Sequence, residues 1–133
     1  CSRGAKLSRG PLPKAPNASH GRAMEAAAVV ILCTAPAAGD VAVTLARGLV
    51  EGRLAACVNL IPGVRSLYTW KDELADDEEV QLVIKTQGSL YPAVEAWLRE
   101  HHPYEEPEIL ALPVTLGSPG YLGWLARQTT RPQ

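Results

Sequence analysis

The chain of 133 residues is 47% apolar and 20% charged, the composition of an ordinary soluble globular protein of about one domain. Residues 1–23 carry five basic and no acidic side chains, so the other 8 basic and 14 acidic residues leave 24–133 with a net charge of −6. Phosphate binding needs clusters of Lys and Arg, and a membrane-spanning helix needs roughly 20 apolar residues in a row, so we expect neither a nucleic-acid partner nor a transmembrane segment.

Residues 1–23 mix Gly, Pro and Ser with basic residues and show no apolar period, which predicts a disordered leader before a domain over 24–133. A basic, acid-free leader is typical of organelle transit peptides, and the apolar stretch 26–32 resembles the core of a secretory signal. The three cysteines are odd in number and not closely spaced, which does not indicate a disulfide framework. We therefore expect a cytoplasmic protein, with an organelle or secretory route as the alternative.

The first two predicted elements are a strand and a helix. Residues 28–34 form a nearly continuous β-branched run, typical of a buried strand, and Pro36 ends it. Apolar residues then recur at helical spacing over 40–51. Gly52 is expected to end this helix in the left-handed conformation.

A hairpin follows. The apolar stretch 54–61 is closed by Pro62-Gly63, and residues 66–70 and 79–86 alternate around a polar turn, which predicts two antiparallel strands. The acidic run between them is expected to be a solvated hairpin tip. Its members are Asp72, Glu73, Asp76, Asp77, Glu78 and Glu79.

The last elements are a helix capped by Ser89 that ends before Pro103, an edge-like strand over 109–114, and a short helix opened by Ser118. The resulting order, β-α-β-β-α-β with an added C-terminal helix, predicts an α+β fold of the ferredoxin-like type. The first strand is apolar on both alternations. We infer that both faces of the sheet are covered and predict a homo-oligomer.

The stretch from His101 to Glu108 is the richest in chemical groups. Cys33, His101 and His102 are ligand types that suit copper or zinc. Adjacent residues on a helix point about 100° apart, so the two histidines can share an ion only if the helix unwinds at Pro103 or a neighbouring subunit helps. The alternative for Cys33 is a buried small hydrophobe.

Three carboxylates follow the histidines and could support acid–base chemistry. No second element is obviously aimed at them, and we expect structural ion pairs to Arg53 or Arg65 instead. No nucleophile–base pair can be assembled, so we do not expect an enzyme.

Six motifs occur in an order that is specific in combination. They are Cys33–Pro36, Arg53–Gly63, Ser66–Trp70, Val83–Thr86, His101–Ile109 and Tyr121–Leu125. With these motifs the chain resembles the CutA, or divalent-cation tolerance, family over about residues 26–128.

The resemblance implies a ferredoxin-like subunit in a tight homotrimer with joined sheet edges, and a link to divalent-cation tolerance with copper as the usual ion. In bacterial members the copper ligands match Cys33, His101 and His102. We therefore expect a trimeric protein that binds Cu(II), with Zn(II) or other divalent cations as alternatives, and contributes to metal tolerance.

Two other functions stay open. Trimeric ferredoxin-like proteins resemble the PII signalling type, which bind small anionic ligands between subunits. Here such a cleft would be lined by Arg53, Lys85, Tyr104 and Glu108. A purely structural scaffold that presents a partner surface is the third hypothesis.

Overall fold

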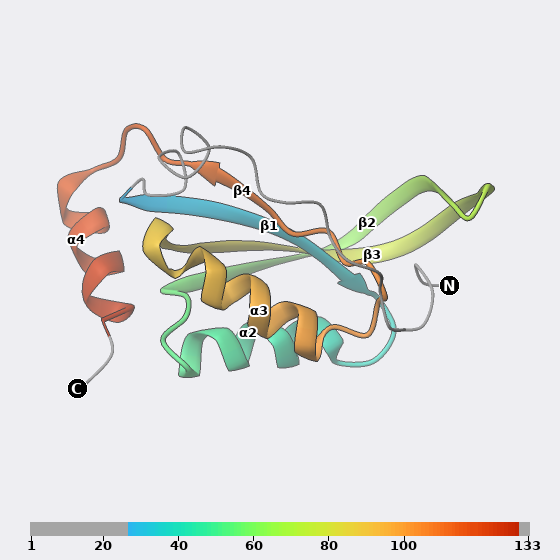
Figure 1. The fold of residues 1–133 in the computed structure, drawn as a ribbon, viewed down its shortest axis with the longest axis horizontal. Coiled ribbons are helices and arrows are strands. Elements are labelled where there is room, and N and C mark those ends of the chain that lie inside the picture. Colours follow the sequence, from blue (N-terminus) through green and yellow to red (C-terminus); the bar gives the residue numbers. More distant parts are fainter. Residues whose placement is uncertain (1–26, 131–133) are drawn as a thin grey trace.

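Four strands form one antiparallel sheet in the order β2-β3-β1-β4 (Figure 1). This computed structural model describes residues 27–130, and the predicted leader over 1–23 lies outside the described residues. The elements are β1 (Ala28–Pro36), α2 (Val41–Glu51), β2 (Cys57–Trp70), β3 (Glu73–Gln87), α3 (Tyr91–His101), β4 (Leu110–Pro113) and α4 (Pro119–Gln128). Their order confirms the predicted α+β, ferredoxin-like fold with an added C-terminal helix.

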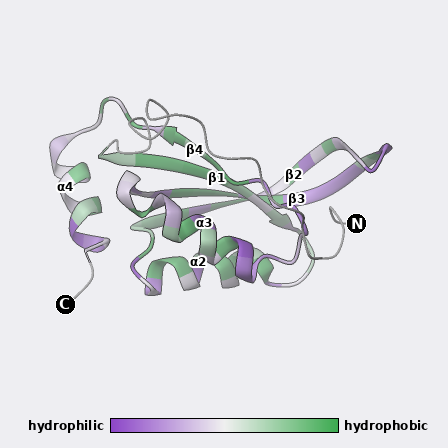
Figure 2. Cartoon of the chain, viewed as in Figure 1, coloured by the Kyte–Doolittle hydropathy of each residue, from purple (hydrophilic) through white to green (hydrophobic). Residues whose placement is uncertain are grey.

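The apolar run of β1 lies at the centre of the sheet, between β3 and β4. Its odd-numbered side chains, Val29, Ile31 and Cys33, are fully buried against Leu49 of α2 and Leu98 of α3. Figure 1 shows both helices along this one face of the sheet, and Figure 2 shows hydrophobic colour along β1 and β4. Alternation in β1 therefore points one row of side chains into the core.

The opposite face of the sheet is apolar, and among the described residues only α4 packs on one end of it, where Leu125 clusters with Ala28. The register aligns Leu32 with Val83 and Leu110, and it aligns Val30 with Leu112. Leu110 is 58% exposed and Leu112 is 51% exposed. We call this surface the open face, and it consists of Val30, Leu32, Val83, Leu110 and Leu112. If both faces of the sheet are covered in an assembly, as predicted, the open face is where another subunit would pack.

Helix α2 ends differently from the prediction. Gly52 has a φ of −81°, and the left-handed residue is Arg53, with a φ of 59°. The amide of Leu54 donates to the carbonyl of Leu49, and the amide of Arg53 donates to that of Val50. These two bonds define a Schellman motif, whose left-handed position falls one residue after the helix cap.

The Pro62-Gly63 pair does not close a strand. It forms a bulge inside β2, where the register shifts between Ile61 and Val64 and Gly63 has a φ of 76°. An edge strand tolerates this interruption because, in the part of the chain that the structure describes, its outer side makes no ladder bonds that Pro62 could break. The hairpin therefore continues to Trp70 and extends beyond the rest of the sheet (Figure 1).

Two smaller findings complete the fold. Ser89 does not cap α3, because it lies in a 3₁₀ turn over Gly88–Leu90 and the cap position is Leu90.

Within residues 27–130, the helices are too short and too polar to cross a membrane.

The αL backbone of Arg53 gives a prediction about stability. A side chain in this conformation costs roughly 1 kcal/mol, which glycine avoids. We expect Arg53→Gly to raise the free energy of unfolding by up to about 1 kcal/mol in urea denaturation. Arg53→Ala is the control, because it removes the bond from Arg53 Nη1 to the Gln128 carbonyl but keeps the Cβ. A glycine variant no more stable than the alanine variant would contradict this account.

Candidate functional site

His102 is buried where the end of α3 meets the end of β1, with an exposure of 1%. Its Nε2 lies 2.8 Å from the carbonyl oxygen of Thr34, and the amide of Tyr104 lies 3.1 Å from its Nδ1. A carbonyl accepts and an amide donates, so Nε2 carries the proton and Nδ1 accepts. Both ring nitrogens of a neutral imidazole are therefore used within the protein.

Pro103 explains how two adjacent histidines diverge. The residue before a proline is pushed away from helical dihedrals, and His102 has an extended ψ of 139°. His101 still belongs to α3, whereas His102 has left it and turns inward. The helix therefore unwinds before Pro103, which was the condition for the two histidines to share one ion. The unwinding leaves one imidazole exposed and the other buried.

Two tyrosine–carboxylate pairs involve the acidic run of β3, one with the loop after α3 and one within the hairpin. Tyr104 is fully buried, and its hydroxyl donates to Glu79 Oε2 at 2.7 Å. The Tyr68 hydroxyl donates to Asp77 Oδ2. Asp77 is 8% exposed and Glu79 is 0% exposed. The prediction that the whole acidic run is a solvated hairpin tip is therefore wrong for these two residues, which are buried and hydrogen-bonded.

Cys33 is part of the hydrophobic core. Its side chain has no exposed surface, and its Sγ lies 3.8 Å from the Thr34 carbonyl oxygen, at the long limit for a thiol. This placement matches the alternative that treated Cys33 as a small buried hydrophobe.

His101 is the exposed imidazole of the pair. Its Nδ1 lies 2.8 Å from the backbone carbonyl oxygen of Trp97, one helical turn earlier, so Nδ1 carries the proton. The ring stacks on the Trp97 indole, with ring centroids 4.1 Å apart and planes 19° apart. Among the described residues, no hydrogen bond to Nε2 is seen. Its lone pair is therefore available to a ligand.

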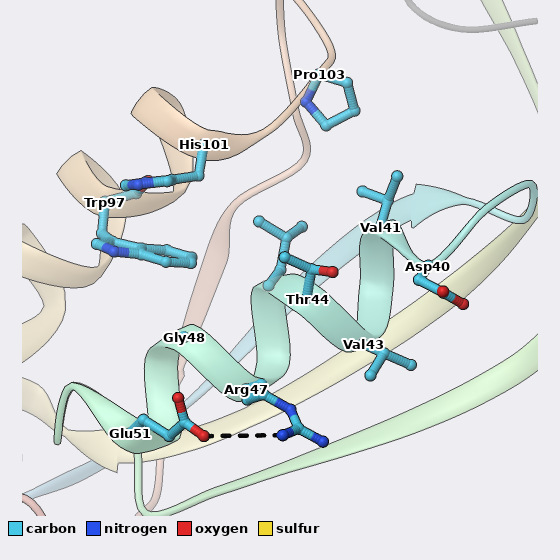
Figure 3. Close-up of a pocket in the computed structure, with 11 residues that line it drawn as sticks. Asp40, Val41, Val43, Thr44, Arg47, Gly48, Glu51, Trp97, His101 and Pro103 are labelled. Carbon is cyan, nitrogen blue, oxygen red and sulfur yellow. Dashed lines mark hydrogen bonds and ion pairs between the residues drawn. The ribbon is translucent and has the colours of Figure 1, made fainter.

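A groove of about 660 Å³ runs beside this stack, between α2 and α3 (Figure 3). Val41, Thr44 and Gly48 line it from α2, and Trp97 and His101 line it from α3. Trp97 is not among the residues that the sequence patterns single out. Its spacing of four residues from His101 could have indicated the stack, because side chains at i and i+4 meet on a helix.

The three predicted metal ligands do not fit one ion within a protomer. Over residues 27–130, no three His, Cys, Asp or Glu side chains gather closely enough to hold a metal. Cys33 is sealed in the core and His102 has both nitrogens engaged. A metal-binding histidine usually donates its other ring N–H to a backbone carbonyl or carboxylate and keeps one nitrogen for the ion. Of the three predicted ligands, only His101 has this arrangement.

The four residues predicted to line a ligand cleft are also spread out. Arg53 bonds the Gln128 carbonyl and Lys85 bonds Asn59, whereas Tyr104 bonds Glu79. Lys85 and Glu79 are six residues apart on β3, roughly 20 Å along a strand. Within one protomer these groups do not form a common cleft.

Glu108 lines a separate hollow of about 550 Å³ with Arg65 and Tyr68. Arg65 donates to both Asp76 carboxylate oxygens, at 2.9 and 2.7 Å, and this hydrogen bond lowers the pKa of Asp76. Lys71 lies 3.9 Å from Glu105 Oε1. Arg53 and Arg65 each bind another group, and the predicted pairing of the loop carboxylates with either arginine stays a prediction.

Comparison with known structures supports the fold. Residues of this chain match the divalent cation tolerance protein from Thermus thermophilus, at 44% identity, a TM-score of 0.74, and coverage of 77% of this chain and 99% of that one. The CutA1 structure from Oryza sativa matches at 35% identity and a TM-score of 0.76, with coverage of 82% and 99%. The sheet and its helices thus define an α+β domain of the same class as these proteins.

Sequence comparison gives the family. Residues 29–128 match the family described as CutA1 divalent ion tolerance protein. The "Divalent-cation tolerance protein CutA" of Pectobacterium atrosepticum is 52% identical over 98 residues, which are 74% of this chain and 88% of that protein. The mouse "Protein CutA" is 53% identical over 89 residues, which are 67% of this chain and 50% of that protein, so the match spans about half of this relative. The chain belongs to the CutA1 divalent ion tolerance family.

The contrast between the two histidines gives a matched pair of variants. His102→Ala removes a partner from the Thr34 carbonyl and from the Tyr104 amide, and each buried group left unsatisfied costs about 1–3 kcal/mol. We expect a loss of about 3 kcal/mol or more in the free energy of unfolding. His101→Ala, at an exposed site, should cost less than about 1 kcal/mol. Equal losses in urea denaturation would mean that His102 is not a structural residue.

Proposed function

We propose that this chain acts as a homotrimer that binds Cu(II) at the imidazole of His101 and contributes to divalent-cation tolerance. Zn(II) and other divalent cations are the alternative ions. The observation that carries the metal part is the state of His101, whose Nδ1 donates to Trp97 and whose Nε2 has no hydrogen bond among the described residues. Histidine binds metals through such a neutral nitrogen.

Charge and family membership support a cation as the ligand. The region 24–133 has a net charge of −6, which raises the local concentration of cations. Relatives that are 45% and 52% identical carry the name divalent-cation tolerance protein. Copper is the ion proposed first because Cu(II) forms the strongest complexes among the divalent first-row metals.

Cys33 and His102 would have to leave their present surroundings before either could bind an ion. For His102 to bind an ion, it must release the Thr34 carbonyl or the Tyr104 amide. Cys33 must become accessible from the core. Since these changes cost stability, we propose His101 as the ligand of the folded state and the other two as structural residues.

The open face supports self-association. It exposes Leu110 and Leu112 beside the partly buried Val30, Leu32 and Val83, and a contiguous apolar surface of this kind marks an interface. Within residues 27–130, no strand pairs with the outer sides of the edge strands β2 and β4, which can therefore join other sheets.

Light scattering after size exclusion tests the homotrimer. We expect the full chain to have a mass of about 43 kDa, three times 14.2 kDa. The double variant Leu110→Asp with Leu112→Asp should lower this mass, because it places charges in the interface. Val43→Asp, at a similarly exposed position on α2, is the control and should leave the mass unchanged. A monomeric wild-type chain would assign the open face to a different partner.

Calorimetric titration with Cu(II) tests the ligand assignment. Cys1 and His20 are replaced by serine and alanine throughout, so that the leader contributes no imidazole or thiol. In this background we expect His101→Ala to abolish the main binding event and Cys33→Ala to retain it. Binding should weaken in acid, because protons compete with the ion for the ligand nitrogen.

Two outcomes would contradict the assignment. Undiminished binding by His101→Ala would exclude it as the ligand. Loss of binding in Cys33→Ala, with an unchanged circular dichroism spectrum, would favour the set of Cys33, His101 and His102.

A further inference from the structure

We infer that the groove between α2 and α3 binds a small amphipathic amine, whose apolar body packs against Trp97 and the valines of α2 and whose ammonium group lies near Asp40. The inference goes beyond the proposed function, because it needs neither a metal ion nor a second subunit. It rests on the size of the groove, on how its wall is held, and on the polar groups that face it.

The groove has the size and the lining of a small-molecule site. Its volume of about 660 Å³ lies within the range of roughly 300–1,000 Å³ that is typical of ligand pockets. Val41 and Val43 contribute apolar surface from α2, and Trp97 and Pro103 contribute it from α3 and the loop that follows (Figure 3). Val43 is 47% exposed, so a ligand that covers it removes apolar surface from water. The body of the ligand is therefore apolar.

The wall at Trp97 is in place before any ligand binds. The indole stacks on the His101 imidazole, with ring centroids 4.1 Å apart. It also packs so closely on α2 that a Cβ at Gly48 would lie 2.5 Å from its Cζ2. Figure 3 shows the indole between the backbone at Gly48 and the ring of His101. A side chain held from two sides loses little conformational entropy when a ligand packs against it.

The polar groups that face the groove select a ligand that donates hydrogen bonds. Asp40 directly precedes α2, but its exposed carboxylate makes no capping hydrogen bond to the helix. Nδ1 of His101 donates to the Trp97 carbonyl, so Nε2 offers a lone pair, and within residues 27–130 no hydrogen bond to Nε2 is seen. Both groups are acceptors, and an ammonium group has three N–H donors and no acceptor.

Charge favours a cation over a neutral donor. Arg47 and Glu51 form an ion pair with each other at 4.0 Å. Among the groove residues that the structure describes, Asp40 is left as the charge without an ion-pair partner. An anionic ligand would be repelled by Asp40 and by the net charge of −6 over 24–133, whereas a cation is attracted by both.

Two probes of nearly equal shape test this inference. Phenethylamine and phenethyl alcohol differ in whether an ammonium or a hydroxyl group ends the same apolar body. Each is titrated into the isotope-labelled full chain with EDTA present, and amide NMR spectra are recorded. We expect saturable shifts of the amides of Val41, Thr44, Gly48 and His101, with a dissociation constant on the order of 1 mM for so small an amine. The alcohol should bind roughly two- to five-fold more weakly, the range that one exposed charge pair contributes.

Asp40→Asn and Glu100→Gln form a matched pair of variants. Each removes one exposed carboxylate, but Glu100 of α3 does not line the groove. We expect Asp40→Asn to bind the amine no more tightly than the alcohol, and Glu100→Gln to keep the wild-type preference. Thr44→Trp, at an exposed position in the groove, should block both probes, and thermal unfolding verifies that each variant is folded.

Three results would overturn the inference. The first is the absence of saturable shifts, or shifts that map to the open face instead of the groove. The second is equal affinity of the wild-type chain for the two probes, which would exclude selection of a cation. The third is an equal effect of Asp40→Asn and Glu100→Gln, which would show that only the overall charge matters. Since EDTA removes metal ions, none of these results depends on the proposed copper site.

Discussion

His102 is buried between the end of β1 and the loop after α3, with both ring nitrogens hydrogen-bonded. This arrangement fixes where α3 ends. His102 adopts extended dihedrals before Pro103, and its ring is hydrogen-bonded to the Thr34 carbonyl and the Tyr104 amide. The loop then carries Tyr104 down to Glu79, which ties β3 to the same point. One neutral imidazole therefore connects a helix, two strands and a loop. It also leaves His101 as the exposed member of the pair.

The second constraint comes from the central strand. β1 is apolar on both alternations, and within residues 27–130 the helices α2 and α3 cover only one of its two faces. An exposed surface with Leu110 and Leu112 at its edge is unfavourable in water. Assembly through this face and metal binding at the outer end of α3 would use different parts of the molecule. The proposed trimer can therefore form without covering the groove between α2 and α3.

The order of elements was predictable from the sequence because periodicity reports which face of each element is buried. The details that failed depend on position in the sheet or on partners distant in the sequence. The local pattern at Pro62-Gly63 predicts a strand end, because nothing in it shows that β2 is an edge strand where a bulge is tolerated. The acidic run predicts a solvated tip that includes Asp77 and Glu79, because their tyrosine partners come from β2 and from the loop after α3. The two histidines looked equivalent as ligands, and only the contacts of His102 distinguish them.

Diffraction at the copper absorption edge from crystals of the Cu(II)-loaded full chain would locate the ion. We expect an anomalous peak beside Nε2 of His101, at bonding distance, with His102 still hydrogen-bonded to Thr34 and Tyr104. A peak bonded to His102 or to Cys33 would contradict it, because it would show that the ion opens the buried network. In that case the ligand set would be Cys33, His101 and His102, and the burial of His102 would be a property of the metal-free state alone.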